Sequence, residues 1–404
     1  MTLLNRRIFL RGAACSMAAH PFVTTVTLAG SDGGRPLGDH RLIVVILRGA
    51  MDGLDVVQPL ADPDFARLRP NLGTGIGTLP LDGFFGLHPG LADLMPLWTA
   101  GELGFVHATS TPYRDKRSHF DGQDLLEAGT GMDAAIGTQR DGWLNRMLQA
   151  VPGLTAETAF AVGREAVPLL NGAAPVMNWA PDQKLDLSAQ SRLLMDHIYH
   201  DDELFRQAAT EAADLAAELG EARMGEGMEP TAKSRGAKLA DVNALVDFAA
   251  DRLLEETRIA AFSLSGWDTH RRQEGAITTP LARLQQVILR LKSALGPEVW
   301  GKTTLLAMTE FGRTAAENGS RGTDHGTAGA MVLAGGALRG QRVLGEWPGL
   351  SEAALYDRRD LMPTSDVRSW AGHAMRSAYG FDRSVIERVI FPGVTLGEDP
   401  GLLR

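Results

Sequence analysis

Residues 303–329, TTLLAMTEFGRTAAENGSRGTDHGTAG, contain the pattern from which the rest of the chain can be interpreted. They open with a short, mostly apolar run, 303–308, which is β-branched at its start and predicts a buried strand. Polar residues follow at once, and Glu310 is the first carboxylate among them. A loop rich in Gly, Asn and Ser then contains Asp324 and His325. Because open α/β sheets place their sites at the carboxyl ends of strands, this order favours a functional site here.

A second strand followed by polar side chains lies just upstream. Residues 258–264 (RIAAFSL) predict a strand that leads into Asp268 and His270. Carboxylate oxygens and imidazole nitrogens suit zinc, manganese and similar divalent ions. A single Asp-His pair in a glycine-containing loop is usually a turn whose side chains cap backbone groups. Two such clusters at equivalent points of consecutive β-α units favour a metal site instead.

A third carboxylate follows the first predicted strand. Residues 42–47 (LIVVIL) form an apolar run typical of a central parallel strand that is covered on both faces. Asp52 follows shortly after this run, directly before Gly53. An Asp-Gly turn is the simpler interpretation of this position when it is taken alone. Taken with the other clusters, it completes a candidate set of metal ligands: Asp52, Asp268, His270, Glu310, Asp324 and His325.

A candidate nucleophile follows the strand predicted at 103–108. Ser118 occupies the N-cap position of a predicted helix, and Asp121 three residues later completes an arrangement like a capping box. A helix N-terminus also attracts anions, and basic residues precede this one. A hydroxyl group held there can attack a phosphate or sulfate ester near a metal. We therefore assign Ser118, Arg117 and His119 to the candidate catalytic group.

The composition limits the classes of function. The chain has 404 residues, of which 44% are hydrophobic and 22% charged, as in an ordinary soluble globular protein. Its formal net charge of −9 argues against general nucleic-acid binding, which needs a basic surface. A small anionic substrate remains compatible with this charge, because a bound metal inverts the local charge. The single cysteine, Cys15, excludes a disulfide framework.

The first 29 residues predict a targeting signal. The paired arginines of NRRIFL, residues 5–10, precede a mildly apolar segment that is too short and too polar to span a membrane. The run resembles the bacterial twin-arginine export signal, which a receptor reads and which is not an anchor. We therefore expect the twin-arginine export machinery as a partner, a periplasmic or exported location, and no stable membrane span.

Strands and helices alternate along the rest of the chain. This order predicts an α/β fold with a mainly parallel central sheet flanked by helices. We expect one domain over residues 40–400, with a helical insert at about 189–257. The apolar positions between 281 and 295 predict an amphipathic crossover helix that ends at Gly296-Pro297. Right-handed crossovers would bring the strand ends, and the candidate ligands, to one edge of the sheet.

Six short motifs connect the chain to a known family. LRGAMDGLD, RSHFDGQD, DGWLNR, GWDTH, TEFGRT and GTDHG occur in this order behind the arginine pair. They resemble the exported bacterial family called domain of unknown function 1501, and the resemblance covers almost all of the mature chain. That family is assigned to the alkaline phosphatase and sulfatase superfamily. The resemblance therefore implies an alkaline phosphatase-like fold and usually two divalent ions, which would be zinc, manganese, calcium or magnesium.

The same resemblance implies roles for single residues. Asp52 matches the superfamily's metal-binding Asp after the first strand, and Ser118 matches its Ser or Thr nucleophile at a helix start. Asp268 and His270 resemble the ligands of one metal, although only one residue separates them, where the superfamily usually has more. Either Glu310 or the Asp324-His325 pair resembles the later Asp-His pair, because no His follows Glu310.

Two functional hypotheses follow. The first is an exported metal-dependent hydrolase of phosphate or sulfate esters, in which two ions ~3.5–4 Å apart activate the nucleophile and stabilise the leaving oxygen. Its substrate would be a small anionic ester. The second is a non-catalytic binding or assembly protein on a phosphatase-like scaffold, which the irregular spacing of the ligands favours. The fold alone does not choose between them.

Overall fold

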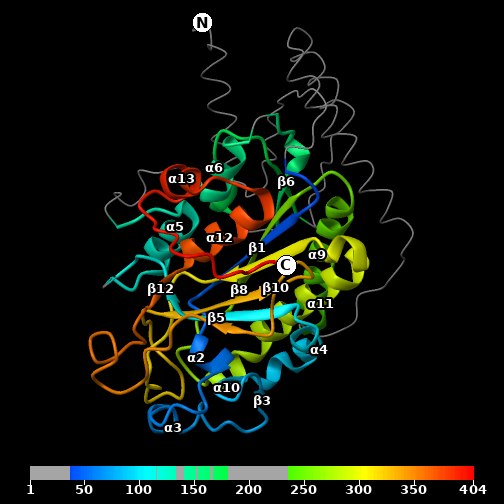
Figure 1. Cartoon of the computed structure of the whole chain (residues 1–404). Coiled ribbons are helices and arrows are strands. Elements are labelled where there is room, and N and C mark those ends of the chain that lie inside the picture. The colour runs from blue at the N-terminus through cyan, green and yellow to red at the C-terminus, as the bar shows by residue number, and fades with distance from the viewer. Residues whose placement is uncertain (1–36, 115, 133–140, 152, 164–166, 181–234) are drawn as a thin grey trace, which may run out of the picture.

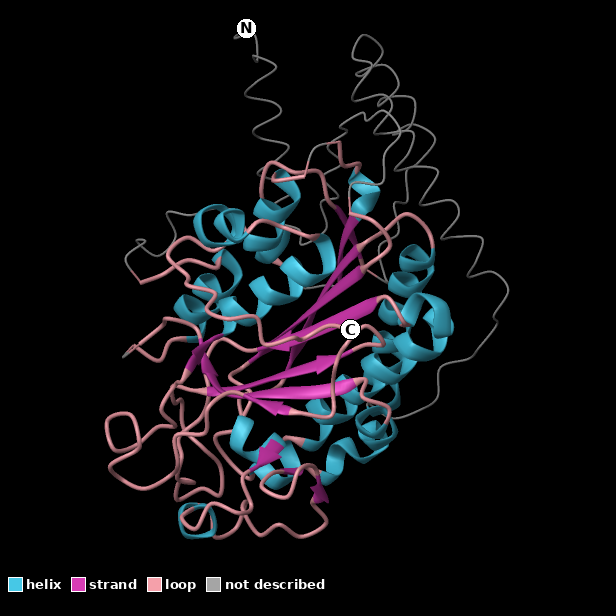
Figure 2. Cartoon of the chain, in the orientation of Figure 1, coloured by secondary structure: helices cyan, strands magenta, loops and turns pink. Residues whose placement is uncertain are grey.

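The computed structural model describes residues 37–114, 116–132, 141–151, 153–163, 167–180 and 235–404. Within these ranges, one large sheet lies between two layers of helices (Figure 1 and Figure 2). The predicted signal, residues 1–29, and most of the predicted helical insert lie outside the described residues. No helix in the described ranges combines the length and the apolar character that a membrane crossing needs.

The large sheet has nine strands in the order β11-β5-β10-β9-β1-β8-β6-β7, and β12 pairs with β5. Their bounds are β1 Arg41–Arg48, β5 Leu103–Ser110, β6 Ala159–Val162, β7 Met177–Trp179, β8 Ile259–Ser265, β9 Thr303–Met308, β10 Gly329–Ala334, β11 Val343–Leu344 and β12 Ser365–Asp366. All pairs are parallel except those of β10, which runs antiparallel to both β5 and β9. The predicted α/β class with a mostly parallel sheet is therefore confirmed.

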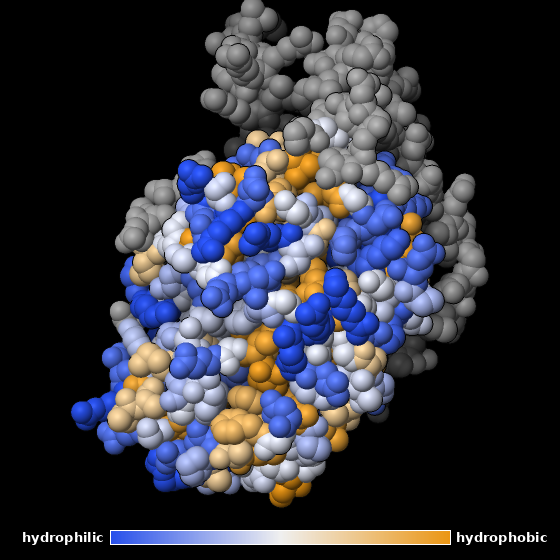
Figure 3. All heavy atoms as spheres, viewed as in Figure 1, coloured by the Kyte–Doolittle hydropathy of each residue, from blue (hydrophilic) through white to orange (hydrophobic). Residues whose placement is uncertain are grey.

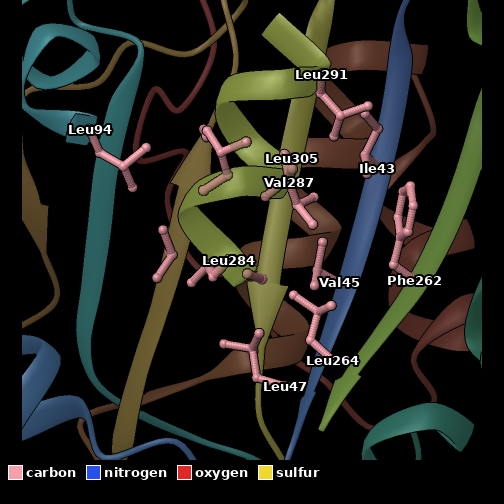
Figure 4. Packing of buried hydrophobic residues seen from close by; sticks show 14 of the residues in the cluster. Ile43, Val45, Leu47, Leu94, Phe262, Leu264, Leu284, Val287, Leu291 and Leu305 are labelled. Atoms are coloured by element: carbon pink, nitrogen blue, oxygen red, sulfur yellow. The ribbon is translucent and has the colours of Figure 1, made fainter. Parts of the chain in front are cut away.

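The position of strand β1 in the sheet explains why the run at 42–47 is apolar throughout. Ile43, Val45 and Leu47 face one hydrophobic cluster, and their sequence neighbours on the opposite face belong to another. Figure 4 shows the first cluster, where the side chains of one long helix lie against this strand and its neighbours. Since both faces are covered, no position in the strand needs a polar side chain.

The helical layers come from segments far apart in the chain. The first cluster is covered by η1 (Pro89–Leu94), α4 (Met95–Thr99), α9 (Arg235–Leu254) and α11 (Thr278–Trp300). The second is covered mainly by α6 (Trp143–Gln149), α12 (Val367–Tyr379) and η4 (Ile386–Ile390). In α11 the backbone leaves helical geometry at Gly296, where the helix was predicted to end, but helical structure then continues to Trp300.

The other described elements are short. They are α2 (Gly53–Val56), α3 (Phe65–Leu68), α5 (His119–Ala128), η2 (Ala156–Thr158), η3 (Pro168–Leu170), α10 (Gln273–Ala276) and α13 (Arg383–Val385), together with a small sheet of β2 (Val57–Gln58), β4 (Gly86–Leu87) and β3 (Leu79–Pro80). The face of the molecule in Figure 3 mixes hydrophilic residues with smaller hydrophobic areas, as is usual for a protein surface.

One edge of the large sheet collects the segments that matter for function. Strands β1, β5, β8 and β9 all end at this edge, because they point in the same direction. Strand β10 begins there, because it runs the opposite way. The loops after four strands and the loop before a fifth therefore meet at one place, as the sequence predicted for the strand ends.

Candidate metal centre

Four polar side chains meet at this edge: His119 from the start of α5, Asp268 and His270 from the loop after β8, and His325 from the loop before β10. Oδ1 of Asp268 lies 3.0 Å from Nε2 of His270, 3.3 Å from Nε2 of His325 and 3.5 Å from Nε2 of His119. The ligand atoms of His119, Asp268 and His325 all lie within 4.8 Å of one another. Two imidazole nitrogens and a carboxylate oxygen thus face a common point, and Nε2 of His270 lies beside this group, near Asp268 and His325.

Each of the three imidazole rings is held in its orientation by a contact of its Nδ1 atom. In His119 this atom donates to Oε1 of Glu310 at 2.7 Å, and in His270 it donates to Oδ1 of Asp324 at 3.2 Å. In His325 it donates to the backbone carbonyl of Arg117 at 2.8 Å. Since carboxylates and carbonyls only accept, Nδ1 of each ring must carry a proton to make these contacts. Nε2 of each ring faces a further acceptor, Oδ1 of Asp268, so a neutral ring with its proton on Nδ1 turns a lone pair toward this oxygen. Histidine ligands of metals are held in this way.

Two of these lone pairs point at each other. Nε2 of His270 lies 3.0 Å from Nε2 of His325, and in neutral rings neither atom carries a proton. The contact is repulsive unless a proton or a metal cation lies between the rings. Nε2 of His119 is buried and has no hydrogen-bond partner among the described residues. A cation bound here would remove the repulsion and also give this atom a partner.

Arg313 fixes the carboxylate of the group. Its guanidinium is buried and donates from Nη2 to Oδ1 of Asp268 at 2.6 Å, and also to the backbone carbonyls of Gly49 and Trp267. Burial raises the pKa of Asp268, but the hydrogen bond and charge of Arg313 outweigh burial and leave this pKa below its usual value. Asp268 is therefore held ionised and in a fixed position.

Glu310 lies behind the imidazoles. Its Oε1 accepts from the backbone N–H groups of Gly49 and Ala50 and from the side chains of His119 and Gln123, at 2.7 to 3.1 Å. Burial raises the pKa of Glu310, but these donors, first among them His119, lower it below its usual value. Conversely, the hydrogen bond to Glu310 raises the pKa of His119 against the effect of burial. In this geometry Glu310 orients a ligand.

The structure does not bring Asp52 to the imidazole group. Its Oδ2 accepts from Nη1 of Arg69 and from Nε2 of Gln273, both at 2.6 Å, and the three side chains are buried. The amide oxygen of Gln273 accepts in turn from the hydroxyls of Thr269 and Thr323, which belong to the two loops that bear Asp268 and His325. Asp52 thus supports the ligand-bearing loops from behind.

The candidate nucleophile caps a helix next to one of the imidazoles. Oγ of Ser118 accepts from the N–H of Asp121 at 3.4 Å, and the backbone N–H of Ser118 donates to the hydroxyl of Tyr113. Arg117 adopts a positive φ of 53°, and its carbonyl holds His325. A non-glycine residue in this conformation is strained, and such strain is common at functional sites.

Sequence reasoning predicted some of these residues and missed others. It grouped Asp268, His270, Glu310, Asp324 and His325, which the structure brings together. It placed His119 in the catalytic group, whereas the geometry makes this residue a candidate ligand. It assigned no role to Arg313 or Gln273, although Arg313 lies inside the motif TEFGRT.

Two solved structures resemble the fold weakly. The crystal structure of Ps i-CgsB is 10% identical with a TM-score of 0.38, and the match covers 90% of this chain and 76% of that chain. The C-terminal periplasmic domain of EcEptC from Escherichia coli, in complex with Zn, is 11% identical with a TM-score of 0.33, and the match covers 77% of each chain. Among curated proteins, none matches.

A family comparison is more informative. The family described as "Protein of unknown function (DUF1501)" matches residues 106–379, which is more than half of the 404-residue chain. The matched range includes all four side chains of the candidate metal centre, which are His119, Asp268, His270 and His325. It confirms the DUF1501 resemblance that the sequence motifs indicated, over a range that begins after the first motif, LRGAMDGLD. The chain therefore belongs to the DUF1501 family.

Proposed function

We propose that this protein is a metal-dependent hydrolase of phosphate or sulfate esters that holds a divalent ion between His119, Asp268, His270 and His325. The supporting observation is the 3.0 Å contact between Nε2 of His270 and Nε2 of His325, which is unfavourable for two neutral rings. The three Nδ1 contacts add support, because they hold the rings with each Nε2 near Oδ1 of Asp268. A catalytic zinc site needs three protein ligands and a position for water or substrate, and it can expand to five ligands during the reaction, so four protein donors leave room for a substrate.

The chemistry of the donors favours zinc or a similar transition ion. Imidazole nitrogen suits zinc, whereas calcium and magnesium prefer shells made of oxygen. The described residues provide one such donor set. A second ion of the alkaline phosphatase type would need Asp52, whose oxygens already accept from Arg69 and Gln273. We therefore propose one ion, and an alkaline phosphatase-like fold remains part of the proposal.

Several residues of this chain would support ester hydrolysis. When bound, the ion would polarise the ester and lower the pKa of a bound water. Arg313 keeps Asp268 ionised, and Glu310 holds His119 in place. The N-terminus of α5 favours an anionic group beside His119. Ser118, directly before His119, is the proposed nucleophile, and the substrate is a small anionic ester.

Metal analysis of the purified full chain tests the proposal. We expect one transition ion per chain, which the variants His270→Ala and His325→Ala lose. Absence of any ion in protein supplied with zinc or manganese would end the proposal. Aryl phosphates and aryl sulfates then test turnover. Ser118→Ala should abolish turnover while the ion stays bound, whereas Ser118→Thr keeps both a hydroxyl and a helix cap and should retain activity.

A bound ion without turnover would favour a second candidate function, a non-catalytic binding or assembly protein on the same scaffold. The observation on its side is that Oδ1 of Asp268 is already shared with Arg313, and that Asp52 does not add a second ion site. A broad panel of esters and a search for a co-purifying partner separate the two functions.

Export through the twin-arginine machinery to the periplasm is also part of the proposal. It rests on the arginine pair Arg6-Arg7 of the sequence. Replacing both by lysine should leave the protein in the cytoplasm. Fractionation of cells that express both forms measures this, and an unchanged distribution would contradict it.

A further inference from the structure

Two arginines share one buried carboxylate beside His325. Nη1 of Arg359 lies 2.8 Å from Oδ1 of Asp360, and Nη2 of Arg117 lies 3.7 Å from Oδ2 of the same side chain. Asp360 is fully buried and also accepts from the hydroxyl of Thr327. Within this trio of charged side chains, two positive charges face one negative charge, so one positive charge is not balanced.

Both arginines are also attached to His325. The backbone carbonyl of Arg117 accepts from Nδ1 of this histidine at 2.8 Å. On the other side, Nη1 of Arg359 donates to its backbone carbonyl at 3.0 Å. Two residues from segments more than 200 residues apart in the chain therefore hold one candidate metal ligand, Arg117 through its backbone carbonyl and Arg359 through its guanidinium.

The two guanidinium groups are reachable from solvent. The side chains of Arg117 and Arg359 are 39% and 35% exposed, whereas Asp360 between them is covered. A guanidinium has five N–H donors, and the contacts with Asp360 and His325 use only part of this capacity. Exposed donors of this kind bind oxyanions in a bidentate manner.

We propose that Arg117 and Arg359 form a subsite for an oxyanion group of the substrate, a second acidic group beside the ester under attack. Its position next to the reacting centre rests on the proposed function, but its ability to bind an anion does not. The chemical class of the substrate follows: an ester that carries an additional carboxylate, sulfate or phosphate. Asp360 holds the two guanidiniums together and reduces their attraction for the anion.

Calorimetry at low ionic strength tests the subsite. It measures the binding of inorganic phosphate and of inorganic sulfate to the purified full chain. Arg359→Gln and Arg117→Gln should each weaken binding about tenfold. Arg358→Gln is the matched control, because Arg358 is 81% exposed, pairs with Glu352 and should leave the affinity within about twofold. Asp360→Asn should act in the opposite direction and tighten binding several-fold, because it removes the negative charge.

The outcomes separate this proposal from the proposed function. Metal content is measured in every variant, and melting curves establish that each one is folded. If the protein holds no ion and hydrolyses no ester, while anion binding still depends on Arg359, the function fails and the subsite stands. If the esters are hydrolysed but the arginine variants bind both anions like the wild type, the subsite is wrong. It is equally wrong if the wild type binds neither anion, or if Asp360→Asn weakens binding.

Discussion

The carboxylate of Asp52 lies 2.6 Å from Nη1 of Arg69, and neither side chain is more than 1% exposed. The same guanidinium donates to the backbone carbonyls of Thr314 and Ala315. The pair thus joins the loop after β1 to the loop between β9 and β10, where His325 lies. A fully buried pair is costly to break, because the remaining partner keeps an uncompensated charge.

Asp52→Asn should therefore destabilise the fold by about 3–5 kcal/mol and leave ion binding at the proposed site unchanged. The control is Asp64→Asn, because Asp64 pairs with the exposed side chain of Arg67, and such surface pairs contribute about 0–1 kcal/mol. Denaturant unfolding and metal analysis measure the two effects. Loss of the ion at unchanged stability would mean that Asp52 is a ligand after all.

The hydrogen bond between Glu310 and His119 predicts a pH dependence. Glu310 raises the pKa of His119, so the ring stays protonated to a higher pH than an ordinary histidine. The stability that this protonated ring contributes in the metal-free protein is fully present below the ordinary pKa of about 6.5, and it is lost as the pH rises through the folded-state pKa. A metal must displace this proton, so its affinity should increase over the same range.

Glu310→Gln replaces the carboxylate with a neutral amide and should move the midpoint of metal binding to lower pH. Zinc titrations between about pH 5 and 8, the interval in which histidines change charge, measure the midpoint. The direction in which the midpoint of metal binding shifts decides the prediction. A midpoint that stays in place, or rises, would show that Glu310 does not control the proton of His119.

Gly49 lies where the backbone of two loops comes into contact. Its φ is 114°, and a Cβ atom there would lie 2.6 Å from the backbone nitrogen of Asp268. Gly266 has a similar φ of 105°, but a Cβ atom there would meet nothing within 4 Å. Gly49→Ala and Gly266→Ala should both cost about 1–3 kcal/mol in backbone strain.

Gly49→Ala alone should also weaken metal binding, because the added methyl group displaces Asp268. The comparison of metal affinity between the two variants, at equal loss of melting temperature, checks this prediction. Equal metal affinities would mean that the close approach of the two loops is unimportant for the site.

Helix α11 should contribute stability without influencing the site. Leu284 is fully buried against the sheet, as Figure 4 shows, and Leu284→Ala should cost about 2–5 kcal/mol. Leu254, at the end of α9, is 47% exposed, and its replacement by alanine should change stability by less than about 0.5 kcal/mol. Both variants should keep the wild-type metal affinity. Unfolding curves and zinc titrations test both statements, and a loss of affinity in Leu284→Ala would link the core to the site.

The strands could be predicted well because their signal is local. The run at 42–47 is apolar throughout, since helices cover both faces of β1, and the shortness of the run favours a strand over a helix. The direction of β10 was not predictable in the same way. An apolar sequence does not indicate in which direction a strand runs. Only the pairing with β5 and β9 shows that β10 runs antiparallel to them.

The site was predictable where ligands directly follow strands. Asp268 and His325 lie in polar segments next to buried ones, and this contrast is visible in the sequence. Asp52 has the same local pattern, but its partner Arg69 belongs to another segment, so the sequence could not reveal the buried ion pair. The role of Gln273 was hidden for the same reason, since its four hydrogen bonds reach three separate segments.

The ionised groups around the three imidazoles have a consequence for which cation the protein selects. Among the charged side chains that contact the three rings or Asp268, Asp268, Glu310 and Asp324 contribute three negative charges and Arg313 contributes one positive charge, so with neutral rings this set is left at minus two. A doubly charged cation would bring it to electrical neutrality, whereas sodium or potassium would leave one negative charge unbalanced. The proposed site would thus discriminate by valence before size or coordination number is considered.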